Sequence, residues 1–159
     1  MKNPGLLTIK QVAPTDAGVV ALIDKLNRYQ IALYGIEACN LEPPESLIKN
    51  NAFMVGAFSH EELAGIGAIK VLDGYGEIKR MYVEESHRGL SVAEEILSAL
   101  ETYAAGRAIH SVYLETGRLH HAAIKFYRKM GYEVVEQFGD YRPNAVSLYF
   151  GKTLTGNAR

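Results

Sequence analysis

The sequence predicts a mixed α/β fold, in which helices lie on the faces of one β-sheet. Short apolar segments with strand-like patterns recur along the chain, and longer segments repeat their apolar residues at helical spacing. With 159 residues, the chain has the length of one domain with one core. It contains no internal repeat and no low-complexity linker, so we expect a single domain over 1–159 with its core at about 6–154.

The first half of the chain is expected to form a strand, two helices and a hairpin of two strands. Thr15 or Asp16 can cap the first helix, and Gly35 can end it. Pro44 suits the start of the second helix, because proline is tolerated in a first helical turn. The expected ranges are 6–12 for the first strand, about 16–33 for the first helix, a short helix from 43, and 53–58 and 63–71 for the hairpin.

The second half is expected to form a strand, a helix, a strand, a helix and two closing strands. A turn at 73–76 precedes the first of these strands, and Gly131 ends the last helix. Because the strands of the hairpin in the first half are antiparallel, the sheet is expected to be partly antiparallel at its start. The expected ranges are 77–83, 90–105, 111–115, 120–130, 132–138 and 146–150.

Charge and composition argue against several classes of function. The net charge is −1, from 17 basic and 18 acidic residues, so nothing draws the chain to nucleic acid or to an anionic membrane. Cys39 is the only cysteine, which excludes an internal disulfide and fits a reducing compartment. The sequence has no run of about 18 apolar residues and no apolar core of a secretory signal at its start. We therefore expect a cytoplasmic protein.

The most informative stretch is a strand, a tight turn and the start of an amphipathic helix at 77–106. The turn carries Arg88, Gly89, Ser91 and Ala93, which are small or cationic. A helix begins with unpaired N–H groups and a positive dipole end, and small side chains let a phosphate approach them. A pyrophosphate site is therefore predicted, which suggests an enzyme with a phosphorylated cofactor. The alternative for this turn is a plain helix cap, with Ser91 as the N-cap.

This stretch resembles the acyl-CoA signature of the GNAT family of N-acetyltransferases, Arg/Gln-x-x-Gly-x-Gly/Ala. Arg88 and Ala93 fit the signature, and Ser91 stands in place of its middle glycine. A second segment, 120–132, resembles the family motif Asn-x-x-Ala-x-x-x-Tyr-x-x-x-Gly-Phe/Tyr. The residues that fit it are Ala123, Tyr127, Gly131 and Tyr132, with His120 in the asparagine position.

The resemblance covers most of the chain and implies the GNAT acyl-CoA acyltransferase fold, a central and mostly antiparallel sheet flanked by helices. It also implies acetyl-CoA as the acyl donor and no metal. The pantetheine arm would pair with the backbone of 81–83, and 88–93 would hold the pyrophosphate through backbone N–H groups. The cofactor-binding residues implied in this way are Met81, Tyr82, Val83, Arg88, Gly89, Leu90, Ser91, Val92, Ala93 and His120.

Amine acetylation needs a base for the ammonium group and an acid for the departing thiolate. The resemblance implies that Glu77 is the base, and Glu115, at the end of the following strand, is the second candidate. Strand alternation would place Glu77 on the same face as Lys79, Met81 and Val83. The alternative role for Glu77 is an ion pair with Lys79.

Tyr127 is the candidate acid under the same resemblance, because its phenol could protonate the CoA thiolate. The alternative for a tyrosine on an apolar helix face is core packing. The adjacent histidines, His120 and His121, would not share a helix face, which argues against a metal site.

Two segments are expected to select the acceptor, because in the family they wall its pocket. In this chain they are 29–47 and 138–144. Their tyrosines and one arginine suggest a small polar acceptor, with a carboxylate that Arg142 could hold. The alternative for 141–144 is a plain turn. The substrate-binding candidates are Tyr29, Tyr34, Glu115, Tyr141 and Arg142.

The leading hypothesis is an N-acetyltransferase that moves an acetyl group from acetyl-CoA to a primary amine by direct attack. The acceptor would be a small molecule or amino-acid-like, and neither nucleic acid nor membrane is an expected partner. A homodimer stays open, because dimers are common in the family. The alternatives are an acetyltransferase for a protein amine, a non-catalytic acyl-CoA-binding regulator, and an α/β interaction domain without a CoA site.

Overall fold

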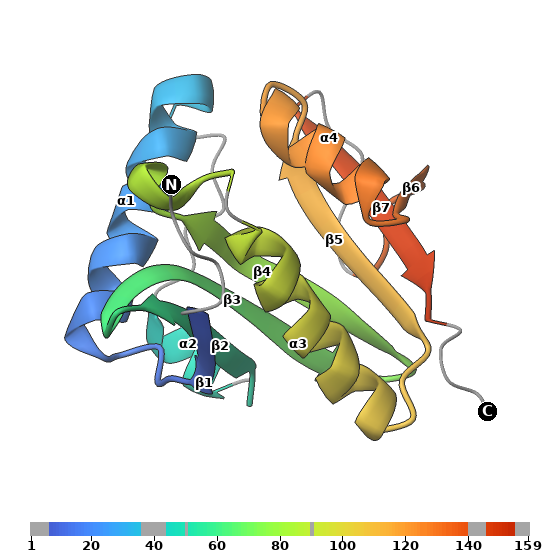
Figure 1. Cartoon of the computed structure of the whole chain (residues 1–159). Coiled ribbons are helices and arrows are strands. Elements are labelled where there is room, and N and C mark those ends of the chain that lie inside the picture. Colours follow the sequence, from blue (N-terminus) through green and yellow to red (C-terminus); the bar gives the residue numbers. More distant parts are fainter. Residues whose placement is uncertain (1–6, 36–43, 50, 90, 140–145, 155–159) are drawn as a thin grey trace.

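The computed structural model describes residues 7–35, 44–49, 51–89, 91–139 and 146–154 of the chain. Within these ranges, seven strands form one sheet with helices on its faces (Figure 1). No described helix combines the length and apolarity that a membrane span requires. The elements in chain order are β1 (Leu7–Gln11), α1 (Ala17–Tyr34), α2 (Pro44–Lys49), β2 (Phe53–Ser59), β3 (Glu62–Leu72), β4 (Tyr75–Val83), a 3-10 turn η3 (Glu85–His87), α3 (Val92–Gly106), β5 (Ser111–Gly117), α4 (His121–Lys129), β6 (Glu133–Val135) and β7 (Ser147–Thr153).

The strands lie in the order β1-β2-β3-β4-β5-β7-β6. Every neighbouring pair is antiparallel except β4 and β5, which run parallel. A parallel pair needs a crossover connection, and α3 lies in the segment that supplies it. The predicted mixed α/β fold with a mostly antiparallel sheet is therefore confirmed.

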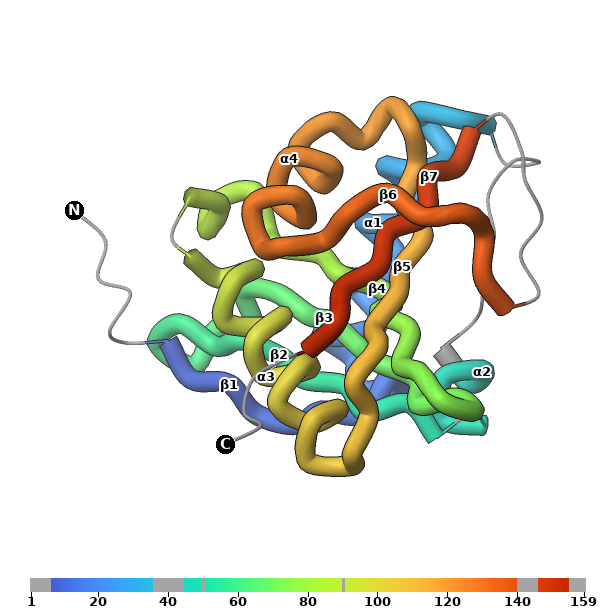
Figure 2. The backbone as a smooth tube through the Cα atoms, turned by 90° about the vertical axis from the view of Figure 1, so that its right-hand side faces the viewer, coloured from blue at the N-terminus to red at the C-terminus, as the bar shows by residue number. Residues whose placement is uncertain are grey.

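Different helices cover the two faces of the sheet. On one face, Leu22 of α1 and Leu47 of α2 pack with Ile66 and Ala68 of β3. Helices α3 and α4 lie on the other face, as Figure 2 shows from the β7 edge. Their cluster includes Val55, Ile69, Ile78, Ile96, Leu97, Leu100, Leu114, Tyr127 and Phe150.

Strands β4 and β5 pair only over their first residues. Their last register pair is Ile78 with Leu114, although β4 continues to Val83 and β5 to Gly117. Figure 1 shows the two strands diverging toward their carboxyl ends. Beyond Ile78, no strand among the described residues pairs with the edge of β4 that faces β5, whereas the other edge stays paired with β3.

Strand β4 also contains a bulge, as the family resemblance implies for this strand. Between the register pairs Ala68–Lys79 and Ile66–Tyr82, β4 has one more residue than β3. Arg80 lies in this interval and adopts a left-handed φ of 60°. The extra residue reverses the alternation of side chains. Met81 and Val83 therefore pack on the α3 side, whereas Glu77 and Lys79 line a space on the α1 side. The prediction that these four residues share one face is wrong beyond Lys79.

The predicted strand over 132–138 is shorter in the structure, where β6 covers only Glu133–Val135. Beyond it, Phe138 packs on the ring of Tyr113 at a centroid distance of 5.2 Å and on Tyr149 at 5.9 Å. These aromatic contacts hold the segment against the sheet without strand pairing.

A polar cluster fixes the end of α4 against α3 and β7. The Tyr132 hydroxyl donates to Glu101 Oε2 at 2.7 Å, and Lys152 Nζ lies 3.2 Å from the same carboxylate oxygen. Lys152 also donates to the carbonyl of Met130 at 2.9 Å. Because α4 carries Tyr127, these bonds help to position that side chain.

Candidate active site

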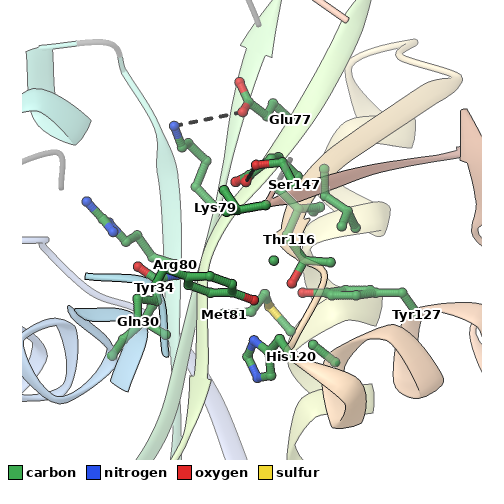
Figure 3. Close-up of a pocket in the computed structure, with 17 residues that line it drawn as sticks. Gln30, Tyr34, Glu77, Lys79, Arg80, Met81, Thr116, His120, Tyr127 and Ser147 are labelled. Carbon is green, nitrogen blue, oxygen red and sulfur yellow. Dashed lines mark hydrogen bonds and ion pairs between the residues drawn. The ribbon is translucent and has the colours of Figure 1, made fainter. Parts of the chain in front are cut away.

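A cavity of about 240 Å³ lies where β4 and β5 diverge, and we refer to it as the β4–β5 cavity. Side chains from α1, β4, β5, α4 and β7 line it, with Glu77 and Lys79 on one side and Tyr127 on another (Figure 3). Its polar and ionisable lining residues are Gln30, Tyr34, Glu77, Lys79, Arg80, Glu115, Thr116, His120, Tyr127 and Ser147.

The two predicted carboxylates lie at different depths of this cavity. Glu77 is 6% exposed and lies opposite Tyr113 of β5, in the paired part of the strands. Its Oε2 atom is 3.8 Å from Lys79 Nζ, so the predicted ion pair is present. Glu115 is two residues farther along β5, which places it roughly 7 Å closer to the open end.

Glu115 is held by a hydrogen bond from β7. The Ser147 hydroxyl donates to Glu115 Oε2 at 2.5 Å. Burial raises the pKa of the Glu115 carboxyl, and the nearby charge of Glu77 adds to this, whereas the Ser147 bond and the charge of Lys79 oppose it. A carboxylate with a raised pKa binds a proton more readily, which suits a general base.

Tyr127 comes from α4 and closes another side of the cavity. The residue is 6% exposed, and Figure 3 shows its hydroxyl directed toward the cavity. Its ring also packs edge-on against Tyr132 at a centroid distance of 5.8 Å. Burial raises the pKa of the phenol, which therefore stays protonated near neutral pH. Core packing and proton donation are thus compatible at this position.

A second space, of about 440 Å³, lies between the end of β4, the start of α3 and α4, and we refer to it as the α3–α4 cleft. The predicted cofactor residues that line it are Met81, Tyr82, Val83, Arg88, Gly89, Ser91, Val92, Ala93 and His120, while Leu90 lies outside the described residues. The cleft and the β4–β5 cavity share Leu26, Met81, His120, Ala123 and Tyr127. The two spaces therefore meet beside Tyr127, as a reaction between two bound molecules requires.

The loop before α3 has the backbone conformation that glycine favours. Gly89 has a φ of 81°, and Ser91, the N-cap of α3, has a φ of 65°. Ser91 therefore holds the N-cap position that the plain helix-cap alternative gave it, although its side chain makes no capping hydrogen bond. Left-handed geometry gives a physical reason for the glycine that the family signature has at this position.

Ser91→Gly is expected to stabilise the protein and to leave acetyl-CoA affinity unchanged or tighter. A left-handed residue other than glycine costs roughly 1–2 kcal/mol, and the extra chain entropy of glycine offsets about half of that. The free energy of unfolding, measured in urea, should therefore rise by about 0.5–1 kcal/mol.

Ala108→Gly is the matched control, because Ala108 has a φ of 61° and does not line the cleft. It should give a similar gain in stability with no change in binding. A marked loss of acetyl-CoA affinity in Ser91→Gly alone would show that the Ser91 hydroxyl contacts the ligand.

Two cationic side chains, Lys129 and Arg88, lie at the mouth of the α3–α4 cleft. Lys129 Nζ, at the end of α4, lies 3.1 Å from Glu94 Oε2 in the first turn of α3. Arg88 donates from Nε to the carbonyl of Val83 at 3.0 Å, which folds its side chain over the end of β4. Cationic groups therefore lie beside the start of α3, where a phosphate would bind.

The end of α1 reaches across to the start of α4. The Tyr34 hydroxyl accepts a hydrogen bond from the Leu119 N–H at 2.8 Å, and the Tyr29 ring lies 4.9 Å from the ring of His120. Tyr34 lines the β4–β5 cavity as predicted for an acceptor residue, but Tyr29 lines the α3–α4 cleft instead. Burial lowers the pKa of His120, and the charge of Arg88 adds to this effect.

Gly117→Ala is expected to displace Tyr34 and to cost roughly 1–3 kcal/mol of stability, as overpacking does. A Cβ at Gly117 would lie 1.9 Å from the Tyr34 hydroxyl. Gly106→Ala is the control, since no described atom lies within 4 Å of its Cβ position. Thermal unfolding would measure both. If the Gly117→Ala cost persists undiminished in a Tyr34→Ala background, the clash is not its cause.

Sequence reasoning did not name several residues of the β4–β5 cavity as site residues. The sequence marks Lys79 only as a partner of Glu77, and no residue type marks Arg80 as the bulged position that brings its side chain to the cavity. Ser147 also carried no signal, because its role depends on the pairing of β7 with β5. The predicted Tyr141 and Arg142 lie outside the described residues.

Comparisons with known proteins agree with this arrangement. The model of the acetyltransferase (GNAT) family matches residues 19–132. The IAA acetyltransferase of Azospirillum brasilense is 34% identical over 93% of this chain and 98% of its own length.

Solved structures of acyltransferases also resemble this chain. A protein of Klebsiella pneumoniae, provisionally named an acyl-CoA N-acyltransferase, has a TM-score of 0.80 and 36% identity over 96% of this chain and 99% of that one. The PaiA N-acetyltransferase of Thermoplasma acidophilum, solved in complex with coenzyme A, shares the fold with a TM-score of 0.67 and 18% identity over 92% and 98% of the two chains. The chain therefore belongs to the GNAT family and is an acyl-CoA-dependent acyltransferase.

Proposed function

We propose that the protein moves an acetyl group from acetyl-CoA to the primary amine of a small-molecule or amino-acid-like acceptor. The meeting of the β4–β5 cavity with the α3–α4 cleft beside Tyr127 supports this proposal most strongly. The amine nitrogen would attack the thioester carbonyl directly. A C–N bond forms, the C–S bond breaks, and one proton passes from the amine to the protein while another reaches the sulfur.

Acetyl-CoA fits the α3–α4 cleft by its chemistry. The 15-residue helix α3 begins there with unpaired N–H groups, which suit a pyrophosphate. Beyond Ile78, the β5-facing edge of β4 has no strand partner among the described residues, so its backbone could pair with an amide-bearing arm. Acetyl-CoA supplies the thioester that the amine attacks, and 81–83 and 88–93 would hold it.

Glu115 is the better placed of the two candidate bases. It lies closer than Glu77 to the end of the cavity that meets the cleft, and its pKa is raised. Glu77 lies deeper and is paired with Lys79, so we assign it to support the charge balance of the cavity. Either carboxylate could also act through a water molecule.

Tyr127 would donate the proton to the departing sulfur. Its hydroxyl faces the point where the two spaces meet, and its phenol is protonated near neutral pH. His120 lines the same point from the start of α4, but its place beside Tyr29 suits a wall residue that separates the two substrates from solvent.

The size of the β4–β5 cavity favours a small acceptor. About 240 Å³ is close to the room that eight waters occupy in the liquid, at about 30 Å³ each. This is enough for one amino-acid-sized molecule. A protein amine would have to enter as a single extended side chain.

A thiol-release assay with acetyl-CoA and a panel of primary amines tests this function. Amine-dependent release of CoA, with the acetylated amine identified by mass spectrometry, is the expected result. If acetyl-CoA binds but no amine is acetylated, the non-catalytic regulator becomes the better reading. Acetylation of peptides but of no small amine would favour the protein acceptor.

A further inference from the structure

The β4 bulge places two successive cations beside the same cavity. In a regular strand, Lys79 and Arg80 would point to opposite faces, and Arg80 would enter the apolar cluster below α3. With the bulge, both line the β4–β5 cavity. Figure 3 shows them on a side of the cavity away from Tyr127.

We infer that the acceptor is an amino acid in zwitterionic form, whose carboxylate binds Lys79 and Arg80 while its amine lies near Glu115. The inference rests on the proposed N-acetyltransferase function and names its substrate class. It makes Lys79 and Arg80 specificity residues, which hold the acceptor without taking part in the chemical step.

The balance of charges in the cavity supports a zwitterion. Two acidic side chains, Glu77 and Glu115, stand with two basic ones, Lys79 and Arg80, so the formal charges cancel. A polyamine would add uncompensated positive charge, and a dianion would add uncompensated negative charge. A molecule with one ammonium and one carboxylate matches both signs and leaves the total unchanged.

The placement of these groups on opposite sides of the cavity also fits. Glu115 lies on the β5 side toward the end that meets the α3–α4 cleft, where the amine has to be. Lys79 and Arg80 lie on β4, on the opposite strand of the divergence. An amino acid that spans the gap would therefore present its amine to the thioester and its carboxylate to β4.

The conformation of Arg80 is a separate argument for function. A bulky residue with a φ of 60° is strained, and Arg80 is also only 8% exposed. Its Nη1 atom donates to Asn27 Oδ1 on α1 at 3.4 Å, which directs the side chain along the α1 side of β4. Strain of this kind concentrates at ligand sites, where a ligand can repay it.

The test compares matched acceptors that differ only at the carboxyl group. Alanine, alaninamide and ethylamine form one set, and phenylalanine, phenylalaninamide and phenethylamine form another. We expect kcat/KM for the better amino acid to exceed that of its amide and of its decarboxylated amine at least tenfold. Arg80→Gln should lower kcat/KM for the amino acid about 10- to 100-fold and change that for the amide less than threefold, since it removes a charge-assisted contact.

Two further variants act as controls. Arg28→Gln removes an arginine that pairs with Asp24 on the exposed surface of α1, and it should change neither value. Arg80→Lys keeps the positive charge but not the forked donor geometry, so it should retain part of the preference. Lys79→Gln repeats the test at the second cation if Arg80→Gln is poorly folded.

The outcomes separate this inference from the proposed function. Acetylation of amines without preference for the free carboxylate, or an equal loss for acid and amide in Arg80→Gln, would overturn the inference alone. If no amine is acetylated, line broadening of the same amino acids and amides in NMR spectra still tests the carboxylate site. Selective broadening of the amino acid that Arg80→Gln abolishes would support it, and equal or absent broadening would overturn it.

Discussion

Tyr127→Phe is expected to lower kcat by roughly 10²–10⁴, the range that a positioned general acid contributes. The substitution removes only the hydroxyl that faces the meeting point of the β4–β5 cavity and the α3–α4 cleft. The ring keeps its packing against Tyr132, so stability and acetyl-CoA affinity should change little. Steady-state kinetics and calorimetric titration would measure the two effects separately.

Tyr132→Phe is the matched control for this substitution. Its hydroxyl is also buried, but it donates to Glu101 on α3 and does not line either space. It should cost roughly 1–3 kcal/mol of stability and leave kcat within about twofold. If Tyr127→Phe keeps the wild-type kcat, Tyr127 is a core residue and the sulfur receives its proton from another group.

Glu115→Gln is expected to lower kcat/KM by roughly 10²–10⁴ and to remove the acid limb of its pH profile. The base acts only when it is deprotonated, and burial raises the pKa of Glu115. The wild-type rate should therefore begin to fall at a higher pH than an ordinary glutamate would cause. Glutamine has nearly the same shape and can still accept the hydrogen bond from Ser147, so the cavity should persist.

Glu77→Gln is the comparison that decides between the two carboxylates. It should leave the acid limb in place, with a smaller loss of activity through the altered charge of Lys79. If the acid limb disappears in Glu77→Gln and persists in Glu115→Gln, Glu77 is the base. That result would agree with the role that the family resemblance implies for Glu77.

The same pKa shift predicts a gain in stability for Glu115→Gln. A carboxyl group whose pKa is raised by folding favours the folded state at low pH and loses that contribution as the pH rises through its folded pKa. Glutamine has no charge to bury, so the variant should unfold at a higher temperature than wild type near pH 8. The difference should vanish below the pKa of an unfolded glutamate, about 4.3.

The fold could be predicted from the sequence because its signals are local. Apolar spacing defined α1 and α3, and Gly35 and Gly131 marked helix ends where the structure has φ of 82° and 95°. The cofactor loop was found in the same way, because its residues are contiguous in the chain.

The acceptor side could not be predicted to the same depth, because it depends on geometry between distant segments. The left-handed conformation at Arg80 reverses the alternation of β4, and no glycine marks that position. Ser147 reaches Glu115 only because β7 pairs with β5. The family resemblance favours Glu77 as the base. The depth of each carboxylate, however, depends on where β4 and β5 stop pairing, and the sequence does not show that point.

Calorimetric titration of the purified protein with acetyl-CoA tests the central claim most directly, with ATP and desulfo-CoA as comparison ligands. We predict one-to-one binding of acetyl-CoA and desulfo-CoA with a micromolar Kd and little binding of ATP, because pairing of the pantetheine arm with β4 adds to the phosphate contacts at α3. The absence of acetyl-CoA binding, or equal binding of ATP, would contradict an acyl-CoA site in the α3–α4 cleft.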